Sequence, residues 1–109
     1  MARTSGTTPQ GTLDLLILRA LADEPLHGVG VARRVEQLTR GEFRIPFGSL
    51  FPALHRLQGS GWLAAQWDLS EHNRRAKFYT LTKAGRRRLA AETAEWRRLV
   101  LVMAAALEG

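Results

Sequence analysis

Two segments of the chain carry donor side chains whose chemistry suits the recognition of anions. One segment is Gly48–Leu57 and the other spans positions 74 to 77. The donors in them are His55, Arg56, Arg74, Arg75 and Lys77. A guanidinium can pair with two acceptors at once, on a guanine edge or a phosphate, and an ammonium binds phosphate as a point charge. These residues predict contacts to a polyanion.

No arrangement typical of catalysis occurs in the sequence. The chain has no cysteine, and its three histidines, His27, His55 and His72, do not have the spacing of metal ligands. It also lacks a Gly-rich phosphate loop and paired carboxylates on one helical face. We therefore expect no enzyme and no bound metal or cofactor.

The charge of the whole chain indicates the same class of partner. Its 109 residues include 16 Lys and Arg against 10 Asp and Glu, a net charge of +6, and the isoelectric point is about 11.3. Such an excess favours nucleic acid or an acidic membrane surface. The longest apolar run, Leu99–Leu107, is about half of a membrane span, and Met1–Gly11 has no apolar signal core. A cytoplasmic protein is expected.

The segment Gly48–Leu57 is predicted to be a short helix with one bare face. Leucines at positions 50, 54 and 57 form a single stripe, and the residues outside it are small, polar or basic. Proline lacks an N–H and is tolerated in a first turn, so Pro52 places the helix start at about Gly48 or Ser49. Ser49 is the expected N-cap.

Two helices are predicted before this segment. The first follows Thr12, its expected N-cap, and has an apolar stripe at helical spacing: Leu13, Leu16, Ile17, Ala20 and Leu21. Leu15 and Leu18 lie outside the stripe, so this helix should meet a second surface, for which another subunit is a candidate. The sequence Asp23–Pro25 ends the helix, and the second helix should run from about residue 28 to residue 39.

Two segments with strand character follow, Trp62–Trp67 and Lys77–Leu81. The predicted loop between them, Asp68–Ala76, exceeds the usual hairpin length, and long loops are more often functional. A hairpin with a basic flank, directly after a candidate groove helix, is the layout of a winged helix-turn-helix. A solvated charged loop is the alternative interpretation.

One continuous helix is predicted from Thr82 to about Leu107, with a length of about 39 Å. Its apolar seam alternates spacings of four and three: Leu89, Thr93, Trp96, Val100, Met103 and Leu107. A domain of this size cannot cover the whole seam, so we expect a symmetric homodimer. The expected dimer contacts are Leu15, Leu18, Leu89, Trp96, Val100, Met103 and Leu107.

Trp96 in the middle of this seam is also a candidate ligand contact. Two copies of its ring across a dimer axis could stack on a small planar aromatic effector. Packing between subunits is the alternative role.

Four motifs in order resemble PadR-type transcriptional regulators of bacteria, in the short form with one C-terminal helix. The motifs are Leu13–Leu18, Pro25–Gly28, Gly48–Leu57 with Gly61 and Trp62, and Arg74–Gly85. The resemblance implies a dimeric winged-helix repressor that binds a palindromic operator and often responds to a small molecule. Members commonly carry tyrosine where this chain has Val29 and Phe51, so two hydroxyl contacts to phosphate are missing here.

The sequence therefore predicts a mainly α fold with a small β-hairpin. A flexible arm should occupy residues 1–11, a winged helix-turn-helix DNA-binding domain residues 12–81, and a dimerisation helix residues 82–109. The expected contacts to double-stranded operator DNA are Ser49, Phe51, Pro52, His55, Arg56, Arg74, Arg75 and Lys77. Arg56 could reach either a guanine or a phosphate. The alternative functions are a winged-helix protein-interaction module without DNA binding and a basic RNA-associated protein.

Overall fold

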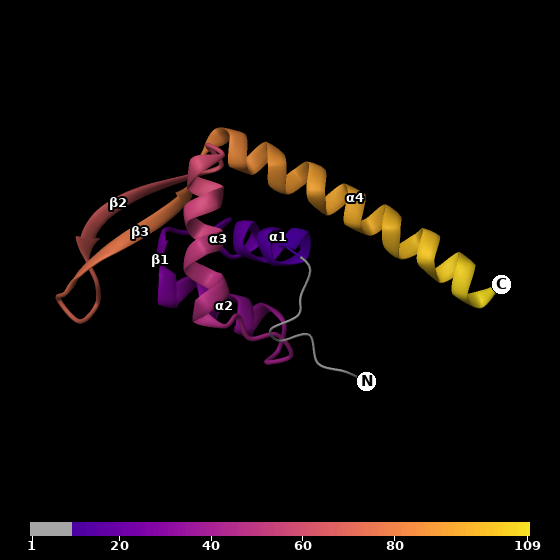
Figure 1. The fold of residues 1–109 in the computed structure, drawn as a ribbon, viewed down its shortest axis with the longest axis horizontal. Helices are drawn as coiled ribbons and strands as arrows, with labels where there is room; N and C mark the ends of the chain where they lie inside the picture. Colours follow the sequence, from indigo (N-terminus) through magenta and orange to yellow (C-terminus); the bar gives the residue numbers. More distant parts are fainter. Residues whose placement is uncertain (1–9) are drawn as a thin grey trace.

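The computed structural model describes residues 10–109 (Figure 1). Its elements in chain order are α1 (Gln10–Ala20), β1 (Leu26–His27), α2 (Gly28–Leu38), α3 (Phe47–Gly59), β2 (Leu63–Leu69), β3 (Arg75–Leu81) and α4 (Lys83–Glu108). The expected arm over residues 1–11 lies outside the described residues, apart from positions 10 and 11, which belong to α1.

The first three helices meet around one core. The most deeply buried side chains are Ile17, Leu18 and Leu21 of α1, Val31 and Val35 of α2, and Leu50, Leu54 and Leu57 of α3. The leucine stripe predicted for α3 is therefore confirmed. Phe43 and Ile45, in the link between α2 and α3, close the same core.

Leu18 was expected at a subunit contact, and this expectation is wrong because only 1% of the residue is exposed. Helix α1 contacts α2 and α3 and also α4. Its second apolar side thus meets elements of the same chain and leaves Leu18 in the core of the protomer.

Three antiparallel strands form one sheet in the order β1-β3-β2. The ladder between β2 and β3 runs from the pair Leu63 and Leu81 to the pair Leu69 and Arg75. The connecting loop therefore spans only residues 70–74, and the longer predicted loop was wrong, because backbone pairing continues beyond the predicted strand ends to the pairs Asp68–Ala76 and Leu69–Arg75. The two-residue strand β1, which pairs with Tyr79 and Phe78, was not predicted.

Two helix starts differ from their predicted positions. Helix α3 begins at Phe47 after Pro46, and no side chain caps it. The backbone N–H of Ser49 donates to the Pro46 carbonyl at 2.9 Å, so Ser49 is inside the first turn and the N-cap prediction was wrong. Pro52 falls in the second turn, not the first. Helix α1 begins two residues before Thr12.

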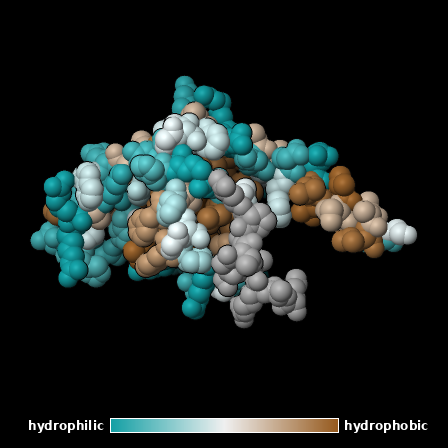
Figure 2. Space-filling view, viewed as in Figure 1, coloured by the Kyte–Doolittle hydropathy of each residue, from teal (hydrophilic) through white to brown (hydrophobic). Residues whose placement is uncertain are grey.

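Helix α4 matches its predicted span. The Thr82 hydroxyl accepts from the Gly85 N–H at 2.9 Å and so caps the helix. The C-terminal half projects away from the remainder of the chain, and its side chains form the apolar end of the molecule (Figure 2). No helix in residues 10–109 is long and apolar enough to cross a membrane.

Candidate nucleic-acid interface

Helix α3 presents a nearly bare row of residues to solvent. The side of the helix opposite its buried leucines carries Gly48, Pro52, His55 and Gly59, all of them exposed. The row contains one side chain longer than proline, and nothing lies within 4 Å of a Cβ built on either glycine. Another molecule can therefore approach the backbone of α3 closely along this row.

An aromatic pair lies on one flank of the row. The rings of Phe47 and Phe51 meet edge to face, with centroids 6.0 Å apart and planes at 71°. The two residues are 56% and 46% exposed. The two adjacent rings form an apolar patch beside the row, which is a candidate contact surface.

The other flank of α3 carries Ser49 and Arg56, both half-buried. The Arg56 guanidinium forms an ion pair with the Asp14 carboxylate of α1. This pair turns the only arginine of α3 toward α1 and away from the bare row.

The hairpin of β2 and β3, called the wing from here on, carries three cations near its tip. The Arg75 guanidinium lies 5.2 Å from the centre of the Trp67 ring, and the Lys77 ammonium lies 5.6 Å from the centre of the Tyr79 ring. Contacts of this kind hold a cation in place without neutralising it. Within residues 10–109 neither of these cations nor Arg74 pairs with a carboxylate, so all three can bind an external anion.

The wing tip is held by a local turn and by a link to His27, which ends β1 and caps α2. The Ser70 N–H donates to the Arg74 carbonyl at 2.8 Å, and Asn73 has a left-handed φ of 59°. His27 Nδ1 accepts from the Gly30 N–H at 3.0 Å, so the ring hydrogen sits on Nε2, which lies 3.5 Å from Glu71 Oε1. This hydrogen bond from His27 lowers the pKa of Glu71.

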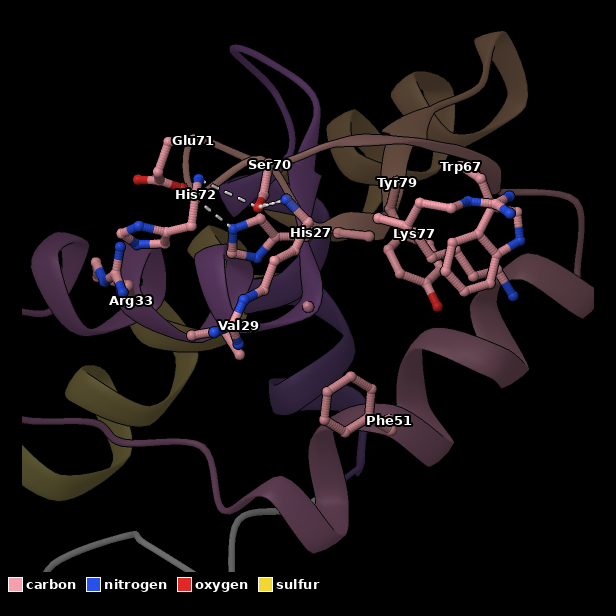
Figure 3. Close-up of a pocket in the computed structure, with 14 residues that line it drawn as sticks. His27, Val29, Arg33, Phe51, Trp67, Ser70, Glu71, His72, Lys77 and Tyr79 are labelled. Atoms are coloured by element: carbon pink, nitrogen blue, oxygen red, sulfur yellow. Dashed lines mark hydrogen bonds and ion pairs between the residues drawn. The ribbon is translucent and has the colours of Figure 1, made fainter.

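A hollow of about 560 Å³ separates the wing from the N-terminal ends of α2 and α3. Phe51 faces Trp67 and Tyr79 across it (Figure 3). Its basic lining residues are Arg33, Arg74, Arg75 and Lys77. A Cβ on Gly28 would stand 2.5 Å from Phe51 Cε1, so the glycine makes room for the ring. The hollow is thus lined by aromatic and by basic side chains.

The structure brings some of the expected DNA contacts together and separates others. Phe51, Arg74, Arg75 and Lys77 line one hollow, whereas Pro52 and His55 lie on the outward row of α3. Sequence reasoning did not assign Phe47, Trp67 or Arg33 to this region. The register that pairs Trp67 with Lys77 explains why the indole belongs to the basic side of the wing.

The expected dimer contacts are mostly exposed on α4. Trp96, Val100, Met103 and Leu107 are between 47% and 80% exposed. Leu15 and Trp96 line a groove of about 240 Å³ between the start of α1 and α4, whereas Leu89 packs partly against the core of the protomer.

Comparisons with known proteins agree on one family. The family model described as "Transcriptional regulator PadR-like family" matches residues 17–91. The chain is 33% identical over 78 residues to the transcriptional regulator Rv3488 of Mycobacterium tuberculosis, over 72% of this chain and 69% of that protein.

Two solved structures are similar over nearly the whole chain. A PadR family transcriptional regulator from Eggerthella lenta is 30% identical, with a TM-score of 0.76 over 91% of this chain and 84% of that chain. A PadR family transcription regulator from hypervirulent Clostridium difficile is 28% identical, with a TM-score of 0.76 over 87% of this chain and 97% of that chain.

Proposed function

This chain belongs to the PadR-like family of transcriptional regulators, and from that premise we propose that it is a repressor that binds a palindromic operator as a homodimer. The observation that carries this proposal is the bare outward row of α3 beside a wing with three cations that pair with no carboxylate in residues 10–109. A surface of this kind fits a duplex that offers base edges in a groove and phosphates on both sides.

In the proposed complex α3 lies in the major groove, with its first turns near base edges. The small residues of the outward row let the backbone come close, and His55 reaches a base edge or a phosphate. Arg74, Arg75 and Lys77 bind phosphates beside the groove, which adds affinity without sequence information. Arg56 acts mainly by fixing α3 against α1 through Asp14.

The projecting half of α4 supports the homodimer. It leaves the apolar seam residues Trp96, Val100, Met103 and Leu107 exposed on one protomer, at the apolar end of the molecule (Figure 2). A second copy of the same helix can cover this surface, because in a twofold-symmetric dimer the same patch of each subunit contacts the other. Two copies of α3 would then meet half-sites about one turn of B-DNA apart, roughly 10 base pairs.

We also propose that a small planar aromatic effector binds beside Trp96 and releases the operator. The support is the exposure of this indole in a groove next to Leu15. A Trp96→Leu variant should lose both fluorescence quenching by the effector and release of DNA. If both responses persist in that variant, Trp96 serves only in packing.

Footprinting tests the proposal as a whole. The purified protein is incubated at moderate salt with the DNA upstream of its own gene, next to the Arg74→Ala variant. Protection of a palindrome, weakened by the substitution, is the expected result. Arg98→Ala is the matched control, because it removes the same charge from the projecting part of α4.

A protein-interaction module without DNA binding is the rival function. It would protect no DNA and would not respond to changes at the wing, although α4 would still dimerise. The absence of enzymatic activity and the cytoplasmic location stay predictions.

A further inference from the structure

We propose that Phe47 and Phe51 read thymine methyl groups in the major groove, so that each operator half-site carries thymine where it meets the first turns of α3. This inference rests on the proposed DNA-binding function and adds the kind of base that the helix selects.

The two rings occupy the part of α3 that comes closest to base edges. They are four residues apart and therefore lie on one side of the helix, next to the outward row. About half of each residue is exposed, at 56% and 46%. Along the rest of this face the exposed residues are glycine, proline and one histidine, so the rings are the largest features that a groove would meet.

The local structure fixes the rings instead of burying them. The ring of Phe51 fits against the start of α2, where Gly28 leaves room for Cε1 and Cζ, and its edge-to-face contact orients the ring of Phe47. Neither ring carries a polar atom. They cannot donate to a phosphate or to a base, so the complementary group on a base edge is an apolar one.

Thymine supplies that group. Among the four bases only thymine presents an apolar substituent, its C5-methyl, on the major-groove edge. The charges around the pair favour a nucleic acid over an apolar protein surface, because Arg33, Arg74, Arg75 and Lys77 line the hollow that Phe51 enters. A duplex with thymine at this position offers a methyl group to the rings and phosphates to the cations.

The size of the effect follows from burial of a methyl group. Removing one buried methyl should weaken binding about fourfold, and removing the symmetric pair of a palindrome about 15-fold. These changes are small compared with the loss of phosphate contacts, so they must be measured as a ratio between matched duplexes.

The experiment begins with selection of bound duplexes from a random pool by the wild-type protein. Each enriched thymine is then replaced by deoxyuridine, which removes only the methyl and keeps the base pair. Dissociation constants are measured for both duplexes with the wild type, Phe47→Ala and Phe51→Ala. When one thymine in a single half-site is replaced, we expect about a fourfold loss with the wild type and a ratio near one with a phenylalanine variant.

Two controls separate this effect from general weakening. Arg74→Ala should bind both duplexes less tightly but keep the wild-type ratio, because a phosphate contact does not depend on the methyl. Thermal unfolding of the phenylalanine variants should stay close to that of the wild type. Phe47→Ala removes the more exposed ring and remains usable if Phe51→Ala unfolds.

Two results would overturn the inference in different ways. If sequences are enriched but the deoxyuridine ratio is near one throughout, or is equal in wild type and both phenylalanine variants, the rings do not read thymine and the operator function stands. If no sequence is enriched, the proposed function fails and this inference with it.

Discussion

The Arg56 guanidinium on α3 forms an ion pair with the Asp14 carboxylate on α1, across 42 positions of sequence. The pair joins the candidate groove helix to the first helix of the core and has side-chain exposures of 38% and 21%. The only arginine of α3 therefore serves to orient this helix against α1.

Arg56→Ala should therefore change DNA binding without relaxing sequence preference. A partly exposed pair contributes about 0–1 kcal/mol to stability, so the free energy of unfolding should fall by no more than about 1 kcal/mol. Binding should weaken by a similar factor on all sequences, as measured with a panel of single-base operator variants. Lost discrimination at one G·C pair would mean instead that Arg56 leaves Asp14 and reads guanine.

Val100→Glu should convert the proposed dimer into monomers. Val100 lies on the apolar seam of α4 and is 49% exposed, so the dimer interface would bury the new carboxylate. Leu101→Glu is the matched control, because Leu101 lies on another side of the same turn and is 71% exposed. Light scattering over a concentration series checks both variants. If neither variant dissociates, the interface does not include the seam at Val100, and if both dissociate equally, it is not confined to that seam.

Gly85→Ala should destabilise the fold although alanine normally favours helices. A Cβ at Gly85 would stand 2.0 Å from the backbone oxygen of Trp62, so the start of α4 would have to move away from this residue, which directly precedes β2. Overpacking of this kind costs about 1–3 kcal/mol, more than the gain of about 1 kcal/mol in helix propensity.

Gly48→Ala is the control for that substitution. Nothing lies within 4 Å of a Cβ at Gly48, so the free energy of unfolding should stay equal or rise slightly. Urea denaturation of both variants checks the pair. An unchanged midpoint for Gly85→Ala would show that α4 does not pack against Trp62 as described.

The link between His27 and Glu71 should be lost at low pH, when Glu71 becomes protonated. The hydrogen bond from His27, with a smaller contribution from the charge of His72, lowers the pKa of Glu71, and partial desolvation opposes both. A lowered folded-state pKa means that the stabilisation is present above the ordinary pKa of a glutamate and is lost as pH falls through the lowered value. The wing tip should therefore loosen only in that acidic range.

His27→Asn tests this link, because asparagine can still cap α2 but does not extend to Glu71. Carbon NMR of the Glu71 carboxyl should show a higher pKa in the variant than in the wild type. Identical titration curves would contradict the link.

The periodic parts of the fold could be predicted from the sequence. The leucine stripe of α3 and the long helix from Thr82 are local patterns, and both are present. Leu18 was misassigned because periodicity shows that a helix has a second apolar side but not which element covers it. The strand β1 has two residues, too few for any alternating pattern.

The candidate site was predictable in composition but not in arrangement. The basic residues of the wing stand out in the sequence, whereas the pairing of Arg56 with Asp14 depends on tertiary packing between distant segments. Trp67 has the pattern of a strand residue, and only the register with β3 places its ring against Arg75. Phe47 could be identified as a surface residue only after the structure showed which residues of α3 are buried.

The salt dependence of binding to the footprinted duplex tests most directly whether α3 and the wing form a DNA interface. About four phosphates neutralised per subunit, eight per dimer, predict a slope near −7 in log affinity against log salt, or roughly 10⁴-fold weaker binding between 50 and 200 mM. Arg74→Ala should reduce the steepness by about 2, and Arg98→Ala should leave it unchanged. Binding that hardly depends on salt, or a slope that Arg74→Ala does not alter, would contradict the account.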